Sequence, residues 1–464
     1  MAEEFSEEAK TTKAISAAFH ARSVALIGAS GDPRKFGYMA LDTLIRGGFK
    51  GEIYPVSPKG GELMGRKVYT SLAQVPTPLD LAVIIVPAES VPSILQEAAK
   101  KGARAAVILS GGFREAGRRD LEEKIAAIAR EHGIRIMGPN IQGINYPPNS
   151  LCAMFFPVIR TRGPLAVISQ SGTVTTALSE WAEGEGLGIS AAVNLGNQVD
   201  LCDSDYLEFF SRDKNTRVIA MYLEALRDGP RFLETMRRAS ARKPVAILKA
   251  GRTVEGQRSA ASHTGALASD YGAFSSACRQ NGAFVAEDLE SLYDSAKGLA
   301  LIPPPRGNRV LSVSSSGGAG TLAADRAEAC GLEMPLMPEE ALAALKGVGL
   351  SPLATLSNPL DLVSIAAGDF GKAILALDPF DVADTVLLNF GDPVAGSAEL
   401  ARELSGSIRA RLAVAYFGGG EEEKQGRMEM HRAGIPVFPT PERAMRGIGA
   451  AVWWTRYRRR RGLA

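Results

Sequence analysis

Residues 23–31 read SVALIGASG, a short apolar segment that runs into a turn of small residues. Two later segments repeat this pattern, LAVISQSGT at 165–173 and VLSVSSSGGAG at 310–320. Each has the length of a buried strand, passes through Gly and Ser, and then enters a helical pattern. Gly permits tight turns, and a helix N-terminus presents N–H groups that suit a phosphate. The sequence therefore predicts three strand–turn–helix segments along one chain.

Further apolar stretches alternate with amphipathic helical segments, at residues 81–86, 105–109, 218–223, 244–248 and 385–389. Buried strands separated by helices are typical of parallel, doubly wound sheets. Proline-rich stretches at 146–149 and 302–307 are expected to act as linkers, because proline stops helices and keeps the chain extended. The prediction is an α/β protein with three doubly wound domains, at 20–146, 150–303 and 307–455.

Composition excludes several classes of protein. The chain has 464 residues, 45% of them hydrophobic, and a formal net charge of +2, so it lacks the charge of a nucleic-acid-binding protein. No apolar run approaches the roughly 18 residues of a membrane span, and the acidic N-terminus is unlike a signal peptide. Four scattered cysteines form no CxxC pair, which argues against disulfides or a zinc site and favours the cytoplasm. We expect no protein-bound metal in this chain.

One histidine stands in an unusual context. Only four histidines occur, and His263 alone lies in a run of small and hydroxyl-bearing residues, AASHTGALAS at 260–269. A flexible, exposed loop of this kind suits an imidazole that accepts a group at a ring nitrogen. The alternative is an exposed loop histidine with no chemical task.

The first predicted domain has the features of a nucleotide-binding fold without the strict GxGxxG spacing. Its second strand ends in IYPVSPKGG at 53–61, which offers no acid for ribose hydroxyls but supplies Lys59. A cation there suits a phosphorylated ribose, as in NADP or coenzyme A, and we favour coenzyme A. A domain that binds neither remains the alternative. The residues expected at this ligand follow three strands: Gly28, Ala29, Ser30, Gly31, Lys59, Val86, Pro87, Ser110, Gly111 and Gly112.

Several short motifs occur in a fixed order over nearly the whole chain. They are GAS at 28–30, GPN at 138–140, SQSG at 169–172, LEA at 223–225, KAGR at 249–252, SHTG at 262–265 and NPLD at 358–361. With these motifs the chain resembles the α subunit of NDP-forming acyl-CoA synthetases, in the succinyl-CoA synthetase superfamily. The resemblance implies a Rossmann-like CoA-binding domain followed by two flavodoxin-like ligase domains.

The resemblance also implies roles for individual residues. The histidine that matches His263 is phosphorylated on a mobile loop, and the carboxylate that matches Glu224 orients it. Two turns present helix N-termini to the phosphate, and loops near Asn140 border the substrate. The residues expected at phosphate or substrate are Asn140, Ser169, Gln170, Ser171, Gly172, Ser316, Gly317, Gly318, Ala319 and Gly320. A helix N-terminus contributes about 0.3–1 kcal/mol to anion binding when exposed, and up to about 2 when partly buried.

The resemblance further implies an ATP-grasp domain for synthesis from a nucleotide, and the sequence contains no GxxxxGK[ST] motif. We therefore expect a separate ATP-grasp β subunit to bring ATP or GTP with Mg²⁺, in a hetero-oligomer that acts on a small carboxylic acid or its acyl-CoA. Two alternatives remain at this point: an NADP-dependent oxidoreductase, and a non-catalytic CoA- or acyl-CoA-binding module.

Overall fold

The computed structural model describes the backbone of residues 2–155, 157–264 and 270–463, and their side chains except at 2–7 and 260–264. Contacts divide the chain into two compact units. Unit 1 comprises residues 1–184 and 188–283, and unit 2 comprises residues 185–187 and 284–464. The three predicted domain ranges stay a prediction beside this division.

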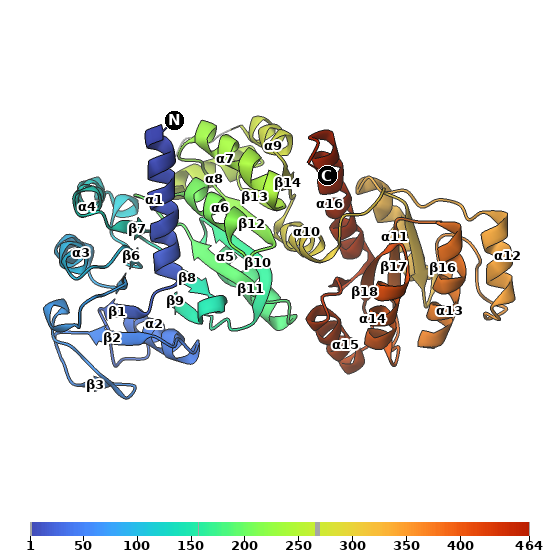
Figure 1. Ribbon diagram of the computed structural model, residues 1–464, viewed down its shortest axis with the longest axis horizontal. Coiled ribbons are helices and arrows are strands. Elements are labelled where there is room, and N and C mark those ends of the chain that lie inside the picture. The colour runs from blue at the N-terminus through green and yellow to red at the C-terminus, as the bar shows by residue number, and fades with distance from the viewer. Residues whose placement is uncertain (1, 156, 265–269, 464) are drawn as a thin grey trace. The chain divides into compact units, whose positions relative to one another are not determined.

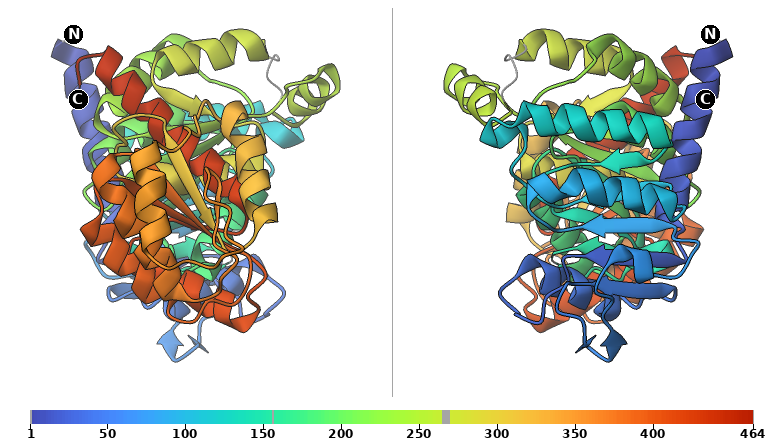
Figure 2. Two further views of the ribbon diagram at one scale, coloured as in Figure 1. Left: turned by 90° about the vertical axis from the view of Figure 1, so that its right-hand side faces the viewer. Right: turned by 90° about the vertical axis from the view of Figure 1, so that its left-hand side faces the viewer.

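The first sheet of unit 1 contains five parallel strands in the order β2-β1-β5-β6-β7 (Figure 1). Its helices α3 and α4 lie side by side over one face, and their apolar residues form one core with the strands (Figure 2). Strands that are buried on both faces read as continuous apolar runs, which is why the sequence revealed them. The bounds are β1 (Ser23–Ile27), β2 (Glu52–Val56), β5 (Leu81–Ile84), β6 (Ala105–Ile108), β7 (Arg135–Met137), α2 (Phe36–Arg46), α3 (Val91–Lys100) and α4 (Arg119–His132), with β3 (Glu62–Leu63) and β4 (Arg66–Lys67) as a small hairpin.

Six strands of the second sheet lie wholly in unit 1, in the order β13-β12-β10-β11-β8-β9. The first four are parallel, and β8 and β9 add an antiparallel edge. The strands are β8 (Gly143–Tyr146), β9 (Leu151–Met154), β10 (Arg162–Ser169), β11 (Ile189–Asn194), β12 (Val218–Leu223) and β13 (Val245–Lys249). The helices are α5 (Gly172–Gly184), α6 (Asp203–Arg212), α7 (Gly229–Arg242), α8 (Val254–Thr264) and α9 (Tyr271–Gln280).

Two features of unit 1 differ from the sequence-based expectation. The predicted linker at 146–149 is the turn of the β8–β9 hairpin, because prolines fit a turn in which no N–H is required. The acidic N-terminus forms a helix, α1 (Ala2–Phe19), that contacts β6, β7 and α6. Ile15, Ala18 and Phe19 are fully buried at helical spacing, a stripe that the acidic residues nearer the terminus obscured.

Unit 2 contains one parallel sheet in the order β16-β15-β17-β18-β19. The predicted linker at 302–307 lies inside this unit, between α10 and β15. The strands are β15 (Val310–Ser314), β16 (Leu360–Asp361), β17 (Thr385–Phe390), β18 (Arg411–Tyr416) and β19 (Val437–Phe438), and β14 (Ala283–Val285) carries the chain across the unit boundary. The helices are α10 (Leu289–Leu301), α11 (Gly317–Ala329), α12 (Glu339–Gly347), α13 (Ala367–Leu377), α14 (Ser397–Ser407), α15 (Glu421–Arg432) and α16 (Pro441–Arg460).

The parallel part of all three sheets has the same strand order. Counted along the chain, the order is 2-1-3-4, continued by a fifth parallel strand in the first and third sheets. The predicted segments at 23–31, 165–173 and 310–320 each contain the first strand, β1, β10 or β15, which stands where the order reverses. Ligands of open α/β sheets bind at the carboxyl ends of the strands at this point. The predicted α/β class with doubly wound sheets is confirmed. Among the described helices, none is long and apolar enough to cross a membrane.

Candidate functional site

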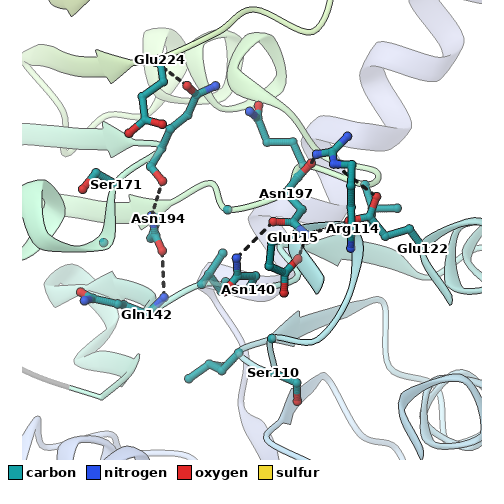
Figure 3. A pocket seen from close by; sticks show the side chains of 18 of the residues that line it. Ser110, Arg114, Glu115, Glu122, Asn140, Gln142, Ser171, Asn194, Asn197 and Glu224 are labelled. Atoms are coloured by element: carbon teal, nitrogen blue, oxygen red, sulfur yellow. Dashed lines mark hydrogen bonds and ion pairs between the residues drawn. The ribbon is translucent and has the colours of Figure 1, made fainter. Parts of the chain in front are cut away.

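Unit 1 contains a cavity of about 1460 Å³ at the carboxyl ends of strands from both of its large sheets. Figure 3 shows Glu224 and Ser171 at one side of the cavity and Ser110 at another. The first-sheet side is formed by residues after β5 and β6, and the second-sheet side by residues after β10, β11 and β12. Nine predicted site residues line it: Val86, Pro87, Ser110, Gly111, Asn140, Gln170, Ser171, Gly172 and Glu224.

The turn after β10 leads directly into α5. The Ser171 hydroxyl accepts a hydrogen bond from the Val174 N–H at 3.4 Å, as an N-cap residue does. The Ser169 hydroxyl accepts from the Ser171 N–H at 3.1 Å and donates to the Ser171 carbonyl at 2.7 Å. Ser169 is fully buried and shapes the turn, whereas Ser171 and Gly172 border the cavity. The positive end of the α5 dipole therefore faces the cavity, as an anion site requires.

Gln170 connects this turn to Glu224. Its Oε1 accepts from the backbone N–H groups of Glu224 at 2.5 Å and Ala225 at 3.0 Å, and its Nε2 donates to the Ala225 carbonyl at 2.7 Å. Glu224 directly follows β12 and is half-buried, and its carboxylate borders the cavity (Figure 3). Gln170, which the sequence predicted as a contact of phosphate or substrate, lines the cavity, and its amide binds the backbone of residues 224–225.

Two neighbours set the electrostatics around Glu224, the buried Lys249 and the half-buried Tyr222. The Lys249 ammonium donates to the backbone carbonyls of Glu224 and Ala250, at 2.7 Å each. Burial lowers the pKa of Lys249, and the Glu224 carboxylate opposes that shift. Burial, followed by the Glu224 charge, raises the pKa of Tyr222 to about 12, so this phenol stays neutral and can donate to Glu224 Oε1 at 3.5 Å. Lys249 thus fixes the backbone of Glu224 through its carbonyl.

Asn194, which the sequence did not single out, joins three segments of the cavity wall. It ends β11, and its Nδ2 donates to the carbonyls of Ser169 at 3.0 Å and Gln170 at 3.3 Å. Its Oδ1 accepts from the Gln142 N–H at 2.8 Å (Figure 3). Gln142 in turn accepts from the Thr176 hydroxyl on α5 at 2.8 Å. An Asn at the end of a buried strand was the available signal, since such a residue requires partners.

A second polar network lines the far side of the cavity. Asn197 Nδ2 donates to Glu115 at 2.6 Å and to Glu122 at 2.7 Å, and Asn140 donates to Asn197 Oδ1 at 3.3 Å (Figure 3). Arg114 donates to the Asn197 carbonyl at 2.9 Å. Burial would raise the pKa of Glu115, but hydrogen bonds from Asn197 and from the N–H groups of Phe113 and Gly112 leave it below its ordinary value. Glu115 is therefore ionised at neutral pH. Asn140 is the residue of this network that the sequence predicted at phosphate or substrate.

The first turn of the chain stands apart from the cavity wall. The N–H groups of Gly28 and Ala29 both donate to the Val56 carbonyl, at 3.0 and 3.1 Å, so both are used in hydrogen bonds within the fold. Gly28 has a φ of 101°, and a Cβ there would lie 1.9 Å from the Ile85 carbonyl oxygen. Helix α2 begins only at Phe36, several residues after the turn. Six predicted coenzyme residues are absent from the cavity lining: Gly28, Ala29, Ser30, Gly31, the exposed Lys59 and Gly112.

The third turn lies in unit 2, before α11. Ser316, Gly317 and Gly318 are exposed, whereas Ala319 and Gly320 are buried. A Cβ at Gly320 would lie 2.7 Å from Pro359, so this glycine serves the packing of α11. Asn358, in the NPLD motif at 358–361, donates to the Val310 and Pro335 carbonyls at 2.9 and 3.1 Å, and Leu360–Asp361 forms strand β16.

His263 falls within α8, near its C-terminal end. Its side chain, with those of all residues from 260 to 269, lies outside the described part of the structure. The sequence predicted a loop around His263, but the backbone is helical from Val254 to Thr264. Alanines at 260 and 261 favour a helix, and the Thr253 hydroxyl accepts from the Gly256 N–H at its start.

Comparison with known proteins identifies the family. Residues 22–147 match a family model for a CoA binding domain, and residues 162–299 match one for a succinyl-CoA ligase like flavodoxin domain. The α subunit of ADP-forming acetate–CoA ligase I from Pyrococcus furiosus is 39% identical over 456 residues, which cover 96% of this chain and 98% of that subunit. The ADP-forming acetate–CoA ligase I of Archaeoglobus fulgidus is 34% identical over 93% of this chain, which spans 62% of that relative's length.

A solved structure supports the same family. The dinucleotide-forming acetyl-coenzyme A synthetase 1 of Candidatus Korarchaeum cryptofilum, in complex with phosphate and ADP, superposes with a TM-score of 0.87. It is 35% identical, and the match covers 96% of this chain and 98% of that one. The fold and the relatives define an acid–thiol ligase. The chain belongs to the NDP-forming acyl-CoA synthetases, in the group of their α subunits.

The predicted family is thereby confirmed. The comparisons favour the ligase over both alternatives, the oxidoreductase and the non-catalytic module. The match over residues 22–147 assigns the first sheet and its helices to a CoA-binding family, as Lys59 and the missing acid after β2 suggested.

Proposed function

We propose that this chain is the α-type subunit of an NDP-forming acyl-CoA synthetase that works with a separate ATP-grasp subunit. The observation that carries the proposal is the shared cavity of unit 1. Residues after β5 and β6 of the CoA-binding segment and the Ser171–Gly172 turn with Glu224 border the same space. The three predicted domains, 20–146, 150–303 and 307–455, remain part of this proposal, as does a cytoplasmic location.

The first step joins phosphate and the acyl group. A phosphate oxygen attacks the thioester carbonyl carbon of acyl-CoA, the C–S bond breaks, and the sulfur takes the proton that phosphate loses. Acyl phosphate and free CoA result. Ser171 and Gly172, at the N-terminus of α5, would hold the phosphate, with Asn140 beside the acyl group. Ser169 and Gln170 support this turn through backbone bonds.

The second step moves the phosphoryl group to the protein. A ring nitrogen of His263 attacks phosphorus, the bond to the acyl oxygen breaks, and the carboxylic acid leaves as its anion. Glu224 would accept a hydrogen bond from the other ring N–H and so fix the tautomer. Phosphohistidine then passes its phosphoryl group to NDP. We assign Mg²⁺ and the nucleotide to the partner subunit, since phosphoryl transfer requires a metal and cationic groups at the β- and γ-phosphates.

The cavity suits CoA in size and chemistry. Ser110 is buried, and its hydroxyl accepts from the Val86 N–H at 3.0 Å, which shapes the wall where Pro87 and Gly111 are exposed. We assign Gly28, Ala29, Ser30, Gly31, Lys59 and Gly112 to the nucleotide end of CoA, beyond the cavity. The residues Ser316, Gly317, Gly318, Ala319 and Gly320 would form a second phosphate site on unit 2.

The partner is supported by the lengths of the relatives. The relative of similar length is named an α subunit, and the single-chain relative extends well beyond the match. The test is reconstitution. We expect the purified chain to bind CoA but to make no acyl-CoA from acetate, ATP and CoA until an ATP-grasp chain is added. Enzyme-like synthesis by the chain alone would contradict the proposal, and a melting shift with NADP but not CoA would favour an oxidoreductase.

A further inference from the structure

The side chain of Gln170 makes three hydrogen bonds to the two residues that follow β12. Both acceptor positions of its Oε1 are occupied by the N–H groups of Glu224 and Ala225, and one hydrogen of its Nε2 is donated to the Ala225 carbonyl. This pattern requires an acceptor and a donor side by side. Among side chains of this length only the glutamine amide provides both at neutral pH.

The backbone from which Gln170 extends is itself fixed. The Gln170 N–H donates to the Tyr222 carbonyl at 3.1 Å, and its carbonyl accepts from Asn194 at 3.3 Å. The turn after β10 is thus tied to its two neighbouring strands, β11 and β12. A displacement of the Ser171 turn would therefore be transmitted to Glu224 through a single side chain.

Glu224 is held at both ends of its backbone unit. Gln170 binds its N–H, and the buried Lys249 ammonium binds its carbonyl at 2.7 Å. These bonds fix the Cα of Glu224, while the carboxylate extends to the cavity (Figure 3). A group that orients a reacting imidazole has to be held to within about 0.5 Å of its working position.

We propose that Gln170 is a positioning residue for Glu224, which couples the phosphate-binding turn to the carboxylate that orients the nucleophile. This inference rests on the proposed function. It assigns to the amide a task that the sequence did not predict, which is to keep the turn and the carboxylate in one fixed geometry.

The test measures phosphoryl transfer from labelled acetyl phosphate to the purified chain in single-turnover experiments, together with CoA affinity by calorimetry. Gln170→Ala should slow labelling about 10- to 100-fold, since a misplacement of about 1 Å can cost about 10² in rate. CoA affinity should stay within about twofold, because the cavity wall assigned to CoA follows β5 and β6, whereas Gln170 follows β10. A second variant, Gln170→Glu, adds a negative charge at the same position. Gln280→Glu adds the same charge at the exposed C-terminal end of α9 and is its control.

Gln170→Glu separates positioning from mere structural support. The glutamate side chain has the shape of glutamine. Its protonated carboxyl can still donate a hydrogen bond to the Ala225 carbonyl, whereas the carboxylate anion cannot. We therefore compare the ratio of the labelling rate of Gln170→Glu to that of the unchanged chain. This ratio should rise as the pH falls toward about 4–5, near the ordinary pKa of Glu. This profile is decisive even if Gln170→Ala fails to fold. A ratio that is independent of pH, or full-rate labelling of Gln170→Ala, would overturn this inference alone. If the unchanged chain takes no label, the proposed function fails as well.

Discussion

Units 1 and 2 each place a strand–turn–helix segment at the point where the strand order reverses, yet the polar groups around the two turns differ. In unit 1 Gln170 binds the backbone of residues 224–225, which follow the neighbouring strand β12. In unit 2 the matching residue is Ser315. Its hydroxyl donates to Asp392 at 3.2 Å and accepts from the Gly391 N–H at 3.0 Å, in the segment that follows β17.

The difference decides what each turn can do. In unit 1 the Gln170 amide joins the two loops, and the Glu224 carboxylate borders the cavity, 3.5 Å from the Tyr222 hydroxyl. In unit 2 the Asp392 carboxylate is itself the partner of the turn, and Asp361 Oδ2 lies 3.2 Å from where a Cβ of Gly317 would stand. Carboxylates beside a helix N-terminus stabilise the helix but compete with an anionic ligand, so we expect the proposed phosphate site of unit 2 to be the weaker of the two. Shared topology positions both turns, whereas the side chains determine their chemistry.

The largest expected effect concerns Glu224. Glu224→Gln should lower the turnover of the reconstituted enzyme by about 10²–10⁴, the range for a lost acid–base or orienting group. Folding and CoA affinity should stay unchanged, because the backbone bonds of Glu224 remain. Steady-state kinetics measure the turnover, and calorimetry measures the CoA affinity. Glu234→Gln, which removes a surface charge on α7, is the control, and equal turnover in both variants would place Glu224 outside the chemistry.

The second prediction concerns stability and pH, because unit 2 also contains a buried ionic cluster. Glu185 binds the buried Lys297 ammonium at 2.7 Å and Arg427 at 3.0 Å. Burial alone would raise the pKa of Glu185, but Lys297 and its other neighbours lower it to about 2. A carboxyl with a lowered pKa stabilises the fold above its ordinary value of 4.5, and this contribution is lost as the pH falls toward 2.

Glu185→Gln should therefore destabilise the protein by about 3–5 kcal/mol near neutral pH, the cost of leaving a buried charge without its partner. It should also flatten the loss of stability between pH 4.5 and 2, measured by denaturant unfolding. Glu422→Gln, at an exposed site on α15, is the control. A parallel pH dependence in the variant and the unchanged protein would show that Glu185 does not carry this stability.

The third prediction compares two asparagines at strand ends. Asn194→Ala should cost about 1–3 kcal/mol, because it leaves buried partners unsatisfied, and it should also slow phosphoryl transfer. Asn389→Ala in unit 2 removes one side-chain bond, to Ser312 at 2.8 Å, and should lower stability without changing labelling by acetyl phosphate. Thermal melts and the labelling rate measure both effects. A slower rate in Asn389→Ala than in Asn194→Ala would reverse the assignment of the site to unit 1.

The smallest effect concerns Asp361. Asp361→Asn should destabilise the protein by about 0.3–1 kcal/mol, because a negative charge near the start of α11 favours the helix dipole. The loss should shrink in high salt, which screens exposed charges. Denaturant unfolding at low and high salt is the measurement, and a gain in stability would mean that this carboxylate opposes the helix.

The sequence predicted the first strand of each sheet and several of the others, namely β2, β5, β6, β12, β13 and β17, because buried parallel strands are continuous apolar runs that often end in Gly and Ser. It did not single out β11 or β18, although both are parallel strands of the same sheets. Glu224 could be placed at a strand end for the same reason. The hydrogen-bond partners of Gln170 could not be predicted, because these bonds join residues more than fifty positions apart in the sequence. Asn194 and Asn197 went unnoticed because a single Asn carries no local signal. The helix around His263 was missed because Ser, Thr and Gly favour caps and turns, although the alanines at 260 and 261 favour a helix.

The most direct measurement is the phosphorylation of His263. The chain is incubated with labelled acetyl phosphate, and the label is tested for stability in base and lability in acid, as a phosphohistidine requires. We expect one label per chain in the unchanged protein, slow labelling in Glu224→Gln, and none in His263→Asn. Label that persists at full level in His263→Asn would contradict the account, because the phosphoryl group would then reside on another residue.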